Sequence, residues 1–378
     1  MPSAHQPVIG LIGLGAMGLG IAQVYLQAGF KVLATDSMEK TREQAPFRLQ
    51  EQLQARVNSG KLSVSQQQDM LSHLHIVPDL AGLAPAHLVI EAIIEALGPK
   101  QAVFQALERI ISPETILATN TSSLSVTALA QSLTHPERVI GLHFFNPAPV
   151  MKLVELVPWA QTNAPTLEKA KTWTEACGKT VIACKDRPGF IVNRCARPFY
   201  GEALAMLEEG RTASDIDAAL LAAGYKIGPL SLIDLVGADI NLAATQSLAQ
   251  AMNNHPRYAI FDCLKNNVAA GLLGRKSGKG FLFPDKPHDP PADAEAICER
   301  IQAVLVNEAC TLLEEGGLDE NGIDTALKLG LNFPYGPFEA ARRIGYDQIR
   351  EILHRCAAHA KPHLQGRYDI SPLLQTRS

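Results

Sequence analysis

The stretch Val8-Ile9-Gly10-Leu11-Ile12-Gly13-Leu14-Gly15-Ala16-Met17-Gly18 decides the fold of the N-terminal part of this chain. An apolar run of strand type ends in a G-x-G-x-x-G motif, and a helical pattern then continues to Ala28. In such a motif the first glycine forms a tight turn, the second lets the backbone approach a pyrophosphate, and the third lets helix and strand pack closely. The motif predicts a dinucleotide site formed by Gly13, Leu14, Gly15, Ala16, Met17 and Gly18.

The next strand, at 31–35, ends at Asp36, the position where a carboxylate binds the hydroxyl groups of an adenosine ribose. An acidic side chain there repels a 2′-phosphate, and the following residues, Ser37-Met38, offer no arginine to bind one. The sequence therefore favours NAD over NADP as the cofactor.

The first 184 residues alternate short apolar runs with helical stretches, which is typical of βαβ units and a parallel sheet covered on both faces. Further strands are expected at 88–94, 116–118, 139–145 and 153–157. Residues 38–74 are Gln-rich and amphipathic without a strand pattern, which predicts two helices. The fold class expected for this part is an α/β doubly wound sheet of Rossmann type.

The pattern changes after Cys184, where the breaker cluster 186–189 is followed by helical periodicity without a convincing strand. A Pro-rich segment at 283–293 has the composition of a stiff linker, and the remainder is helical again. The expected organisation is a Rossmann domain at 1–184 followed by two all-α helical domains in tandem, at 185–286 and 293–378.

The two helical segments resemble each other. The matched features are 202–210 (EALAMLEEG) with 308–316 (EACTLLEEG), Ile216-Asp217 with Ile323-Asp324, and Gly228-Pro229 with Gly336-Pro337. Three matches in the same order at a nearly constant offset indicate a duplication.

Composition and charge exclude several classes of protein. Hydrophobic residues make up 47% of the chain and charged residues 19%, which excludes a disordered polyelectrolyte. A formal net charge of −4 without blocks of like charge predicts neither nucleic-acid binding nor a membrane-binding basic face. The seven cysteines never form a C-x-x-C pair, so we expect reduced thiols, no zinc or other metal site and a cytoplasmic location.

A candidate acid–base pair lies on two neighbouring strands. His143 stands near the end of the run 139–145, and strand carboxyl ends line the ligand crevice of a doubly wound sheet. Glu155 on the next strand is the expected partner, because a carboxylate bound to one imidazole nitrogen fixes the tautomer and leaves the other nitrogen as a base. Asn120-Thr121-Ser122-Ser123-Leu124 follows the strand at 116–118, and its Ser and Thr hydroxyls are expected to cap a helix, to face the same crevice, or both.

Five motifs together carry a resemblance to a known family. They are Gly13-x-Gly15-x-x-Gly18, Glu91-Ala92-Ile93-Ile94-Glu95, Asn120-Thr121-Ser122-Ser123, His143-Phe144-Phe145-Asn146-Pro147 and Pro188-Gly189-Phe190-Ile191-Val192-Asn193-Arg194. In order and spacing, over roughly residues 7–285, the chain resembles the L-3-hydroxyacyl-CoA dehydrogenase family. The resemblance implies oxidation of an acyl-CoA thioester at C3, with hydride passing to NAD.

The resemblance also implies roles for individual residues. His143 is the catalytic base oriented by Glu155, while Ser122 and Asn193 hold the substrate oxygen. The cofactor contacts implied beyond the glycine motif are Asp36, Glu95, Lys100, Asn120, Asn146 and Lys276.

In single-copy relatives the helical domain pairs with the same domain of another subunit. By this resemblance, residues 294–378 are expected to act as an internal partner for the first copy. Glu299-Arg300 stands where the first copy has Asn193-Arg194, so the second copy is expected to lack catalytic function. We expect a monomer or homodimer that acts beside an enoyl-CoA hydratase in fatty-acid or aromatic-acid breakdown.

Two other interpretations stay open. One is a dehydrogenase of a free hydroxy acid, of the 3-hydroxyisobutyrate or gulonate type, which also opens with Gly-Leu-Gly-x-Met-Gly. The former uses a lysine on the inter-domain helix, whereas residues 190–194 contain none; the latter departs mainly around 143–147. The other is a non-catalytic NAD-binding protein like the lens crystallins of this lineage, against which the complete set Ser122, His143, Glu155 and Asn193 argues.

Overall fold

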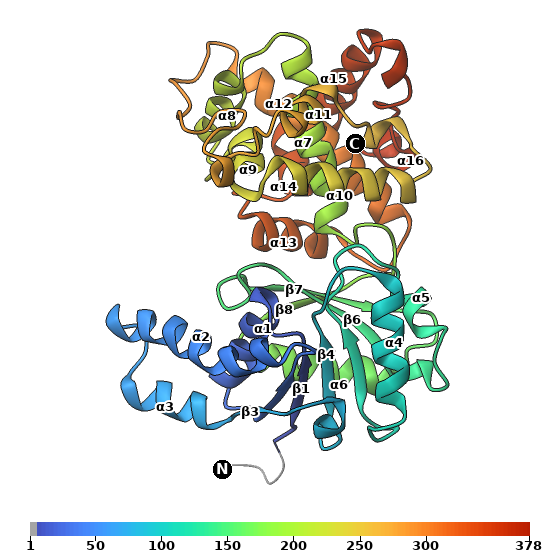
Figure 1. The fold of residues 1–378 in the computed structure, drawn as a ribbon. Helices are drawn as coiled ribbons and strands as arrows, with labels where there is room; N and C mark the ends of the chain where they lie inside the picture. Colours follow the sequence, from blue (N-terminus) through green and yellow to red (C-terminus); the bar gives the residue numbers. More distant parts are fainter. Residues whose placement is uncertain (1–5) are drawn as a thin grey trace. The chain divides into compact units, whose positions relative to one another are not determined.

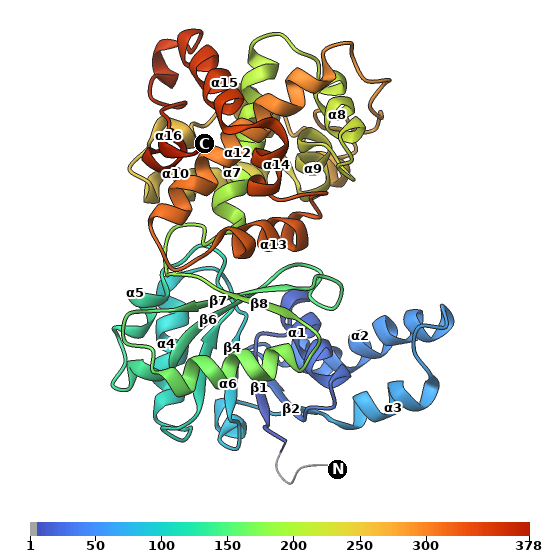
Figure 2. The same cartoon turned by 180° about the vertical axis from the view of Figure 1, so that it is seen from behind.

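The structure is a computed structural model that describes residues 6–378, so residues 1–5 of the predicted first domain lie outside the described part. Two compact units follow each other along the chain, the first ending at Arg187 and the second beginning at Pro188 (Figure 1). The first is a sheet with helices on both faces, and the second is helical, as the view from behind also shows (Figure 2). The predicted fold class, a Rossmann-type sheet followed by a helical region, is confirmed.

One eight-stranded sheet, in the order β3-β2-β1-β4-β5-β6-β7-β8, forms the first unit. All neighbouring strands are parallel except β6 and β7. The strands are β1 (Ile9–Ile12), β2 (Val32–Thr35), β3 (Leu74–Ile76), β4 (Leu88–Glu91), β5 (Ile116–Thr119), β6 (Val139–Phe144), β7 (Leu153–Pro158) and β8 (Thr180–Ala183). The helices are α1 (Ala16–Gln27), α2 (Glu39–Asn58), α3 (Val64–Ser72), α4 (Leu97–Glu108), α5 (Val126–Ala130) and α6 (Ala164–Glu175).

The sheet departs from the sequence pattern at its two edges and at one pairing. The edge strands β3 and β8 are not predicted, because their residues are only partly buried and lack the continuous apolar run of the central strands. β6 and β7 pair antiparallel, whereas the pattern predicts a parallel sheet. Residues 145–152 between them are too few for a helical crossover, which takes a dozen or more. The two helices expected at 38–74 are α2 and α3.

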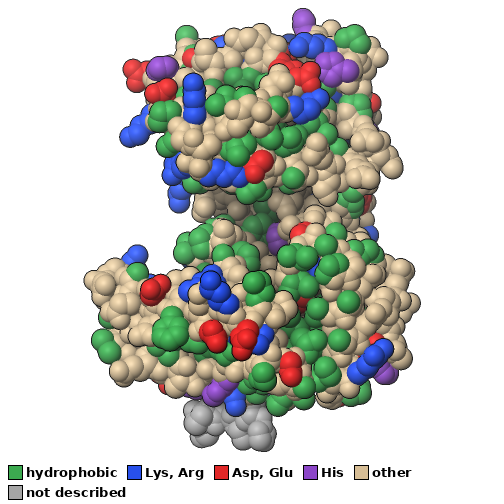
Figure 3. Space-filling model, in the orientation of Figure 1, with side chains coloured by type: hydrophobic (Ala, Val, Ile, Leu, Met, Phe, Trp, Pro, Cys, Tyr) green, Lys and Arg blue, Asp and Glu red, His purple; other side chains and the backbone are tan. Residues whose placement is uncertain are grey.

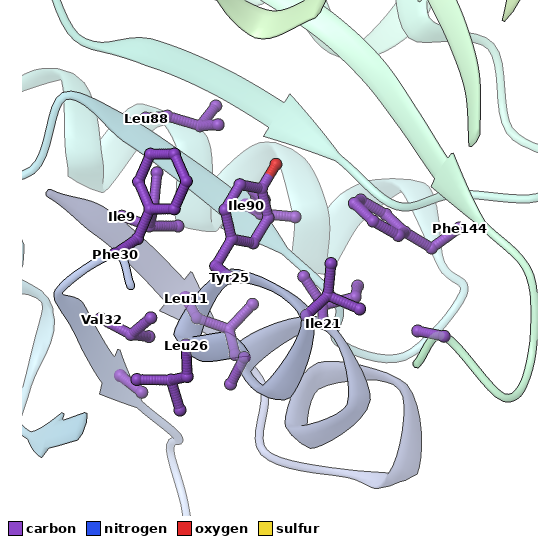
Figure 4. Close-up of a cluster of buried hydrophobic side chains, with 14 of the residues drawn as sticks. Ile9, Leu11, Ile21, Tyr25, Leu26, Phe30, Val32, Leu88, Ile90 and Phe144 are labelled. Carbon is purple, nitrogen blue, oxygen red and sulfur yellow. The ribbon is translucent and has the colours of Figure 1, made fainter. Parts of the chain in front are cut away.

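The core of this unit lies between α1 and the central strands (Figure 4). Tyr25 of α1 meets Phe30 edge-on with ring centroids 5.5 Å apart, and its hydroxyl lies 3.0 Å from Thr174 Oγ1. Since the Thr174 hydroxyl donates to the carbonyl oxygen of Ala170, Tyr25 is the donor in that contact. This packing fixes α1 on the sheet and with it the glycine turn that precedes α1.

The second unit contains two successive sets of helices. The first set is α7 (Val192–Glu208), α8 (Ala213–Ala222), α9 (Pro229–Val236), α10 (Ala238–Ala251) and α11 (Asp262–Ala269). The second set is α12 (Ala294–Glu314), α13 (Glu320–Leu331), α14 (Pro337–Ile344), α15 (Tyr346–Ala358) and α16 (Pro372–Thr376). The long helices α7 and α12 pack against each other, and the Pro-rich segment 283–293 between the sets is neither helix nor strand.

Reciprocal ion pairs join the two sets. Arg194 Nε donates to Glu308 Oε1 at 2.6 Å, and Arg300 Nε donates to Glu202 Oε1 at 2.7 Å. The terminal nitrogens of each arginine bind a second acid, Glu315 for Arg194 and Glu209 for Arg300. A tyrosine and a second arginine complete each site. Tyr258 and Arg257 donate to Glu308. Tyr368 and Arg367 donate to Glu202. The same contacts therefore occur twice: in one site the first set of helices supplies the donors and the second set the glutamate, and in the other site these roles are reversed.

The recurring Asp and Gly-Pro have one local role in both sets. The Asp217 carboxylate accepts from the backbone N–H groups of Leu230 and Ser231 at the start of α9, and a Cβ on Gly228 would lie 2.3 Å from that carboxylate. The second set repeats these contacts with Asp324, Phe338, Glu339 and Gly336. Burial raises the pKa of Asp217, because the hydrogen bonds from Ser231 and Leu230 only partly compensate it.

Two further observations concern the charges on the surface and the length and apolar character of the helices. On the face shown in Figure 3, basic and acidic side chains are interspersed without an extended region of one charge. Among residues 6–378, no helix combines the length and the apolar character that spanning a bilayer requires.

Candidate active site

The glycine motif forms the turn between β1 and α1 that the sequence predicts. Gly13 has φ +93°, which L side chains rarely adopt, and a Cβ there would lie 2.5 Å from the carbonyl oxygen of Ala92. A Cβ on Gly18 would lie 1.8 Å from the carbonyl oxygen of Gly13, so no side chain fits there. A Cβ on Gly15 would meet nothing within 4 Å, so this residue borders open space. That space, together with an α1 N-terminus that no described side chain caps, fits a pyrophosphate.

Asp36 lies directly after β2 and beside the glycine turn. Its Oδ2 accepts from the N–H of Leu14 at 2.8 Å, and its Oδ1 accepts from the N–H of Met38 at 2.9 Å. Arg42 Nη1 donates to the Asp36 carbonyl oxygen at 2.6 Å, and Arg48 Nη1 donates to the Leu14 carbonyl oxygen at 3.1 Å. Both arginines reach back from α2, beyond Ser37-Met38, and are not predicted. No periodic signal marks them, because residues six apart do not share a helix face.

His143 and Glu155 face each other in the antiparallel register of β6 and β7. His143 Nδ1 lies 2.6 Å from Glu155 Oε2, and both side chains are buried. The ring of Phe145 packs against the imidazole with centroids 4.5 Å apart. A carboxylate at Nδ1 fixes the tautomer that carries a proton there, so proton exchange with a substrate falls to Nε2. The hairpin therefore brings the predicted pair together.

The loop after β5 is held by one carboxylate, that of Glu95. Its Oε1 accepts from Thr121 Oγ1 at 2.7 Å, from the N–H of Ser122 at 2.8 Å and from the N–H of Ser123 at 3.1 Å. The Ser122 hydroxyl also donates to it, at 3.2 Å. Burial opposes ionisation of Glu95, but the hydrogen bond from Thr121, the charge of Lys100 and the hydrogen bonds from Ser122 and Ser123 outweigh it and lower its pKa.

The serine that caps the next helix is Ser125. Its hydroxyl accepts from the N–H of Ala128 at 3.2 Å in the first turn of α5 and donates to Asp186 Oδ2 at 2.8 Å. Asp186 accepts in addition from the N–H of Thr127 at 2.7 Å. The capping role considered for Ser122 therefore belongs to Ser125, and the Ser122 hydroxyl contacts Glu95 instead.

A buried ion pair lies behind Glu95. Lys100 Nζ is 2.6 Å from Glu91 Oε1 and 3.3 Å from Glu95 Oε2, and the side chains of Lys100 and Glu91 are 1% and 0% exposed. Glu91 also accepts from the N–H of Ile93 at 2.7 Å and from Thr119 Oγ1 at 2.8 Å. The role of Glu91 is not predicted, although a carboxylate at the end of a buried strand requires partners. The enclosed ammonium of Lys100 reaches the loop after β5 through Glu95.

The remaining candidates are divided between the two units. Asn120 Oδ1 accepts from the last N–H of β6 at 2.8 Å and so ties the ends of β5 and β6 together, while Asn146 is exposed in the loop after β6. Asn193 lies in the first turn of α7, in the helical unit. Lys276, also in that unit, has its Nζ 2.5 Å from Asp239 Oδ1. Within residues 6–378, no group of three or more His, Cys, Asp or Glu side chains is arranged to hold a metal ion.

Two family models match the chain. The model described as "3-hydroxyacyl-CoA dehydrogenase, NAD binding domain" matches residues 8–187. The model described as "3-hydroxyacyl-CoA dehydrogenase, C-terminal domain" matches residues 189–283 and again 297–377, which correspond to the two sets of helices. NAD, the predicted cofactor, is confirmed by the first match.

Individual relatives agree with these models. A 3-hydroxyadipyl-CoA dehydrogenase of Escherichia coli K12 is 33% identical over 98% of this chain and 97% of its own length. A probable 3-hydroxybutyryl-CoA dehydrogenase of Deinococcus radiodurans is 39% identical over 72% of this chain and 98% of its own length. The crystal structure of a 3-hydroxybutyryl-CoA dehydrogenase from Escherichia coli K12 matches with a TM-score of 0.90 and 33% identity, covering 98% of each chain. The predicted enzyme class is confirmed, and the chain belongs to the 3-hydroxyacyl-CoA dehydrogenase family.

Proposed function

We propose that this chain oxidises the 3-hydroxyl group of an L-3-hydroxyacyl-CoA thioester to a 3-oxo group. The observation that carries the proposal is the His143–Glu155 pair, 2.6 Å apart, near the carboxyl end of β6, as the glycine turn lies at the carboxyl end of β1. Alcohol oxidation needs a base for the hydroxyl proton, a fixed hydride acceptor and donors for the developing carbonyl oxygen. NAD supplies the hydride acceptor when bound.

His143 Nε2 takes the hydroxyl proton, and the Glu155 carboxylate stabilises the imidazolium that forms. In the substrate complex the Ser122 hydroxyl, which donates to Glu95 here, turns to donate to the substrate oxygen, where negative charge develops, and the Asn193 amide donates to the same oxygen. Glu95 keeps the loop that carries Ser122 in place through the backbone N–H of that residue. For the cofactor, the open space at Gly15 supports a pyrophosphate contact, and the carboxylate at the end of β2 supports a ribose contact.

NADH formation with L-3-hydroxybutyryl-CoA, followed by absorbance, tests the proposal. A series of thioesters of increasing chain length, including one with a terminal carboxylate, then determines the acyl preference. Turnover of a free hydroxy acid alone would instead support the gulonate or 3-hydroxyisobutyrate type. NAD binding without turnover of any thioester would support a non-catalytic protein.

Replacing Glu155 by Gln is expected to lower kcat, because the neutral amide no longer stabilises the imidazolium. The decrease in kcat is expected to be smaller than the roughly 10²–10⁴-fold that general base catalysis contributes as a whole. The Kd for NADH is expected to stay unchanged. Glu137→Gln is the matched control, since Glu137 pairs with the exposed His135 at 3.6 Å in the same unit. A Glu155→Gln enzyme with native kcat would disprove the assignment.

Asp36 is proposed to select NAD through the adenosine ribose. Replacing Asp36 by a small neutral residue, together with Ser37→Arg, is expected to shift preference toward NADP, because the change removes a repulsive charge and adds a phosphate partner. The ratio of kcat/KM for NAD and NADP measures the shift. An unchanged ratio would show that this carboxylate does not contact the ribose.

We propose in addition that residues 294–378 act as an internal partner for the first set of helices. The reciprocal contacts of Arg194 with Glu308 and of Arg300 with Glu202 support this role. A tethered copy has a high effective concentration and docks in place of another chain. Glu299 precedes Arg300 as Asn193 precedes Arg194, so the second set lacks the amide that would bind a substrate oxygen.

A further inference from the structure

Arg42 places a positive charge at the strand end where Asp36 places a negative one. Its Nη1 lies 2.6 Å from the Asp36 carbonyl oxygen, and its side chain is half-buried. Within residues 6–378 this is its single hydrogen bond, and neither Glu39 nor Glu43 of the same helix forms an ion pair with it. Most of its guanidinium donors therefore remain available to a ligand at this strand end.

The two charges act in opposite directions on a phosphate at the adenosine 2′ position. The Asp36 carboxylate, held by the N–H groups of Leu14 and Met38, repels such a phosphate. A guanidinium attracts it, because its planar set of N–H donors matches phosphate oxygens. The discrimination between NAD and NADP at the end of β2 is thus a balance between the Asp36 carboxylate and the Arg42 guanidinium, since Arg48 contacts the glycine turn instead, through the Leu14 carbonyl oxygen.

We propose that Arg42 is a specificity-determining residue of the cofactor site. Its guanidinium is a latent binding group for the 2′-phosphate of NADP, and the carboxylate of Asp36 alone prevents its use. Removing that carboxylate is then sufficient to admit NADP, without the new arginine at position 37. The inference rests on the proposed contact between Asp36 and the adenosine ribose.

Fluorescence titrations with NADH and with NADPH, in the absence of substrate, test the proposal. Asp36→Ser is expected to weaken NADH binding and to tighten NADPH binding about ten- to hundredfold, the effect of one hydrogen bond to a charged group. Asp36→Asn is expected to act in the same direction while keeping an oxygen for the N–H of Leu14. The gain for NADPH is expected to shrink as salt concentration rises.

Double variants separate Arg42 from general effects of charge. Asp36→Ser combined with Arg42→Gln is expected to lose the NADPH gain, and combined with Arg42→Lys to keep part of it. Asp36→Ser combined with Arg56→Gln is the matched control, because Arg56 lies on the same helix roughly 21 Å further along its axis. This control is expected to keep the whole gain.

The outcomes distinguish the two assignments. If the Asp36 variants weaken NADH binding without an NADPH gain, or if the gain survives Arg42→Gln, the role of Arg42 is overturned and that of Asp36 stands. If both Asp36 variants bind NADH as tightly as the native chain, Asp36 does not contact the ribose, and the inference falls with that assignment.

Discussion

His143→Ala is expected to lower turnover of L-3-hydroxyacyl-CoA by several orders of magnitude and to leave NADH affinity nearly unchanged. General base catalysis alone contributes roughly 10²–10⁴-fold, and the variant leaves no imidazole to take the hydroxyl proton. The imidazole belongs to the β6–β7 hairpin, whereas the glycine turn belongs to β1 and α1, so cofactor binding is expected to persist. Single-turnover kinetics and NADH titration measure the two effects separately.

Two further variants distinguish the loss of the catalytic base from a loss of folded structure. His143→Asn keeps an N–H donor toward the buried Glu155 and is expected to be as inactive as the alanine variant. His135→Ala removes an exposed imidazole that pairs with Glu137 at 3.6 Å, and it is expected to retain native turnover. Near-native turnover of His143→Ala on every thioester would refute the role of His143.

Deleting residues 286–378 is expected to convert the chain into a dimer or an aggregate. The deletion removes Glu308 and Glu315, the acceptors of Arg194, which is 1% exposed. It also removes α12, so the apolar face of α7 that packs against it becomes exposed, and an exposed apolar face favours dimerisation or aggregation. A second truncated chain can restore the contact with its own Glu202, which accepts from Arg300 in the full chain. Light scattering on the truncated and full chains measures the change.

A point variant tests the same contact without exposing a new surface. Glu308→Gln is expected to lower the free energy of unfolding of the full chain by roughly 3 kcal/mol. Asp293→Ala, which removes the exposed contact with Arg211, is expected to lower it by less than about 1 kcal/mol. For the truncation, a chain that stays soluble, active and in the oligomeric state of the full chain would contradict the role of residues 294–378.

The strands that the sequence predicts are those buried on both faces. β1, β4 and β5 are buried along their whole length and carry polar side chains only at their last positions, Glu91 and Thr119. β3 and β8 escape prediction because an edge strand needs no such run. The antiparallel direction of β7 is encoded in the short connection 145–152 rather than in either strand, so a pattern of strands alone does not give it.

The site residues differ in the same way: a sequence pattern marks some of them, and only the folded structure brings the others into place. His143 and Glu155 are predictable as a pair because both stand on consecutive strands and a buried imidazole needs a partner. The contact of Arg42 is not predictable, because it runs from a helical side chain to the backbone oxygen six residues earlier and leaves no periodic pattern. Lys100, in the first half of an amphipathic helix, is ordinarily solvated, and it is buried here because Glu91 provides the opposite charge.

The doubled ion pairs between α7 and α12 also affect how this chain can evolve. In a symmetric dimer one codon specifies both occurrences of a contact, so a single mutation damages the interface twice. Here Arg194–Glu308 and Arg300–Glu202 are specified by different codons, so a mutation weakens one occurrence while the other persists. Each side can therefore drift and be compensated separately, and positions outside the ion pairs, such as Glu299, are free to diverge from their counterparts.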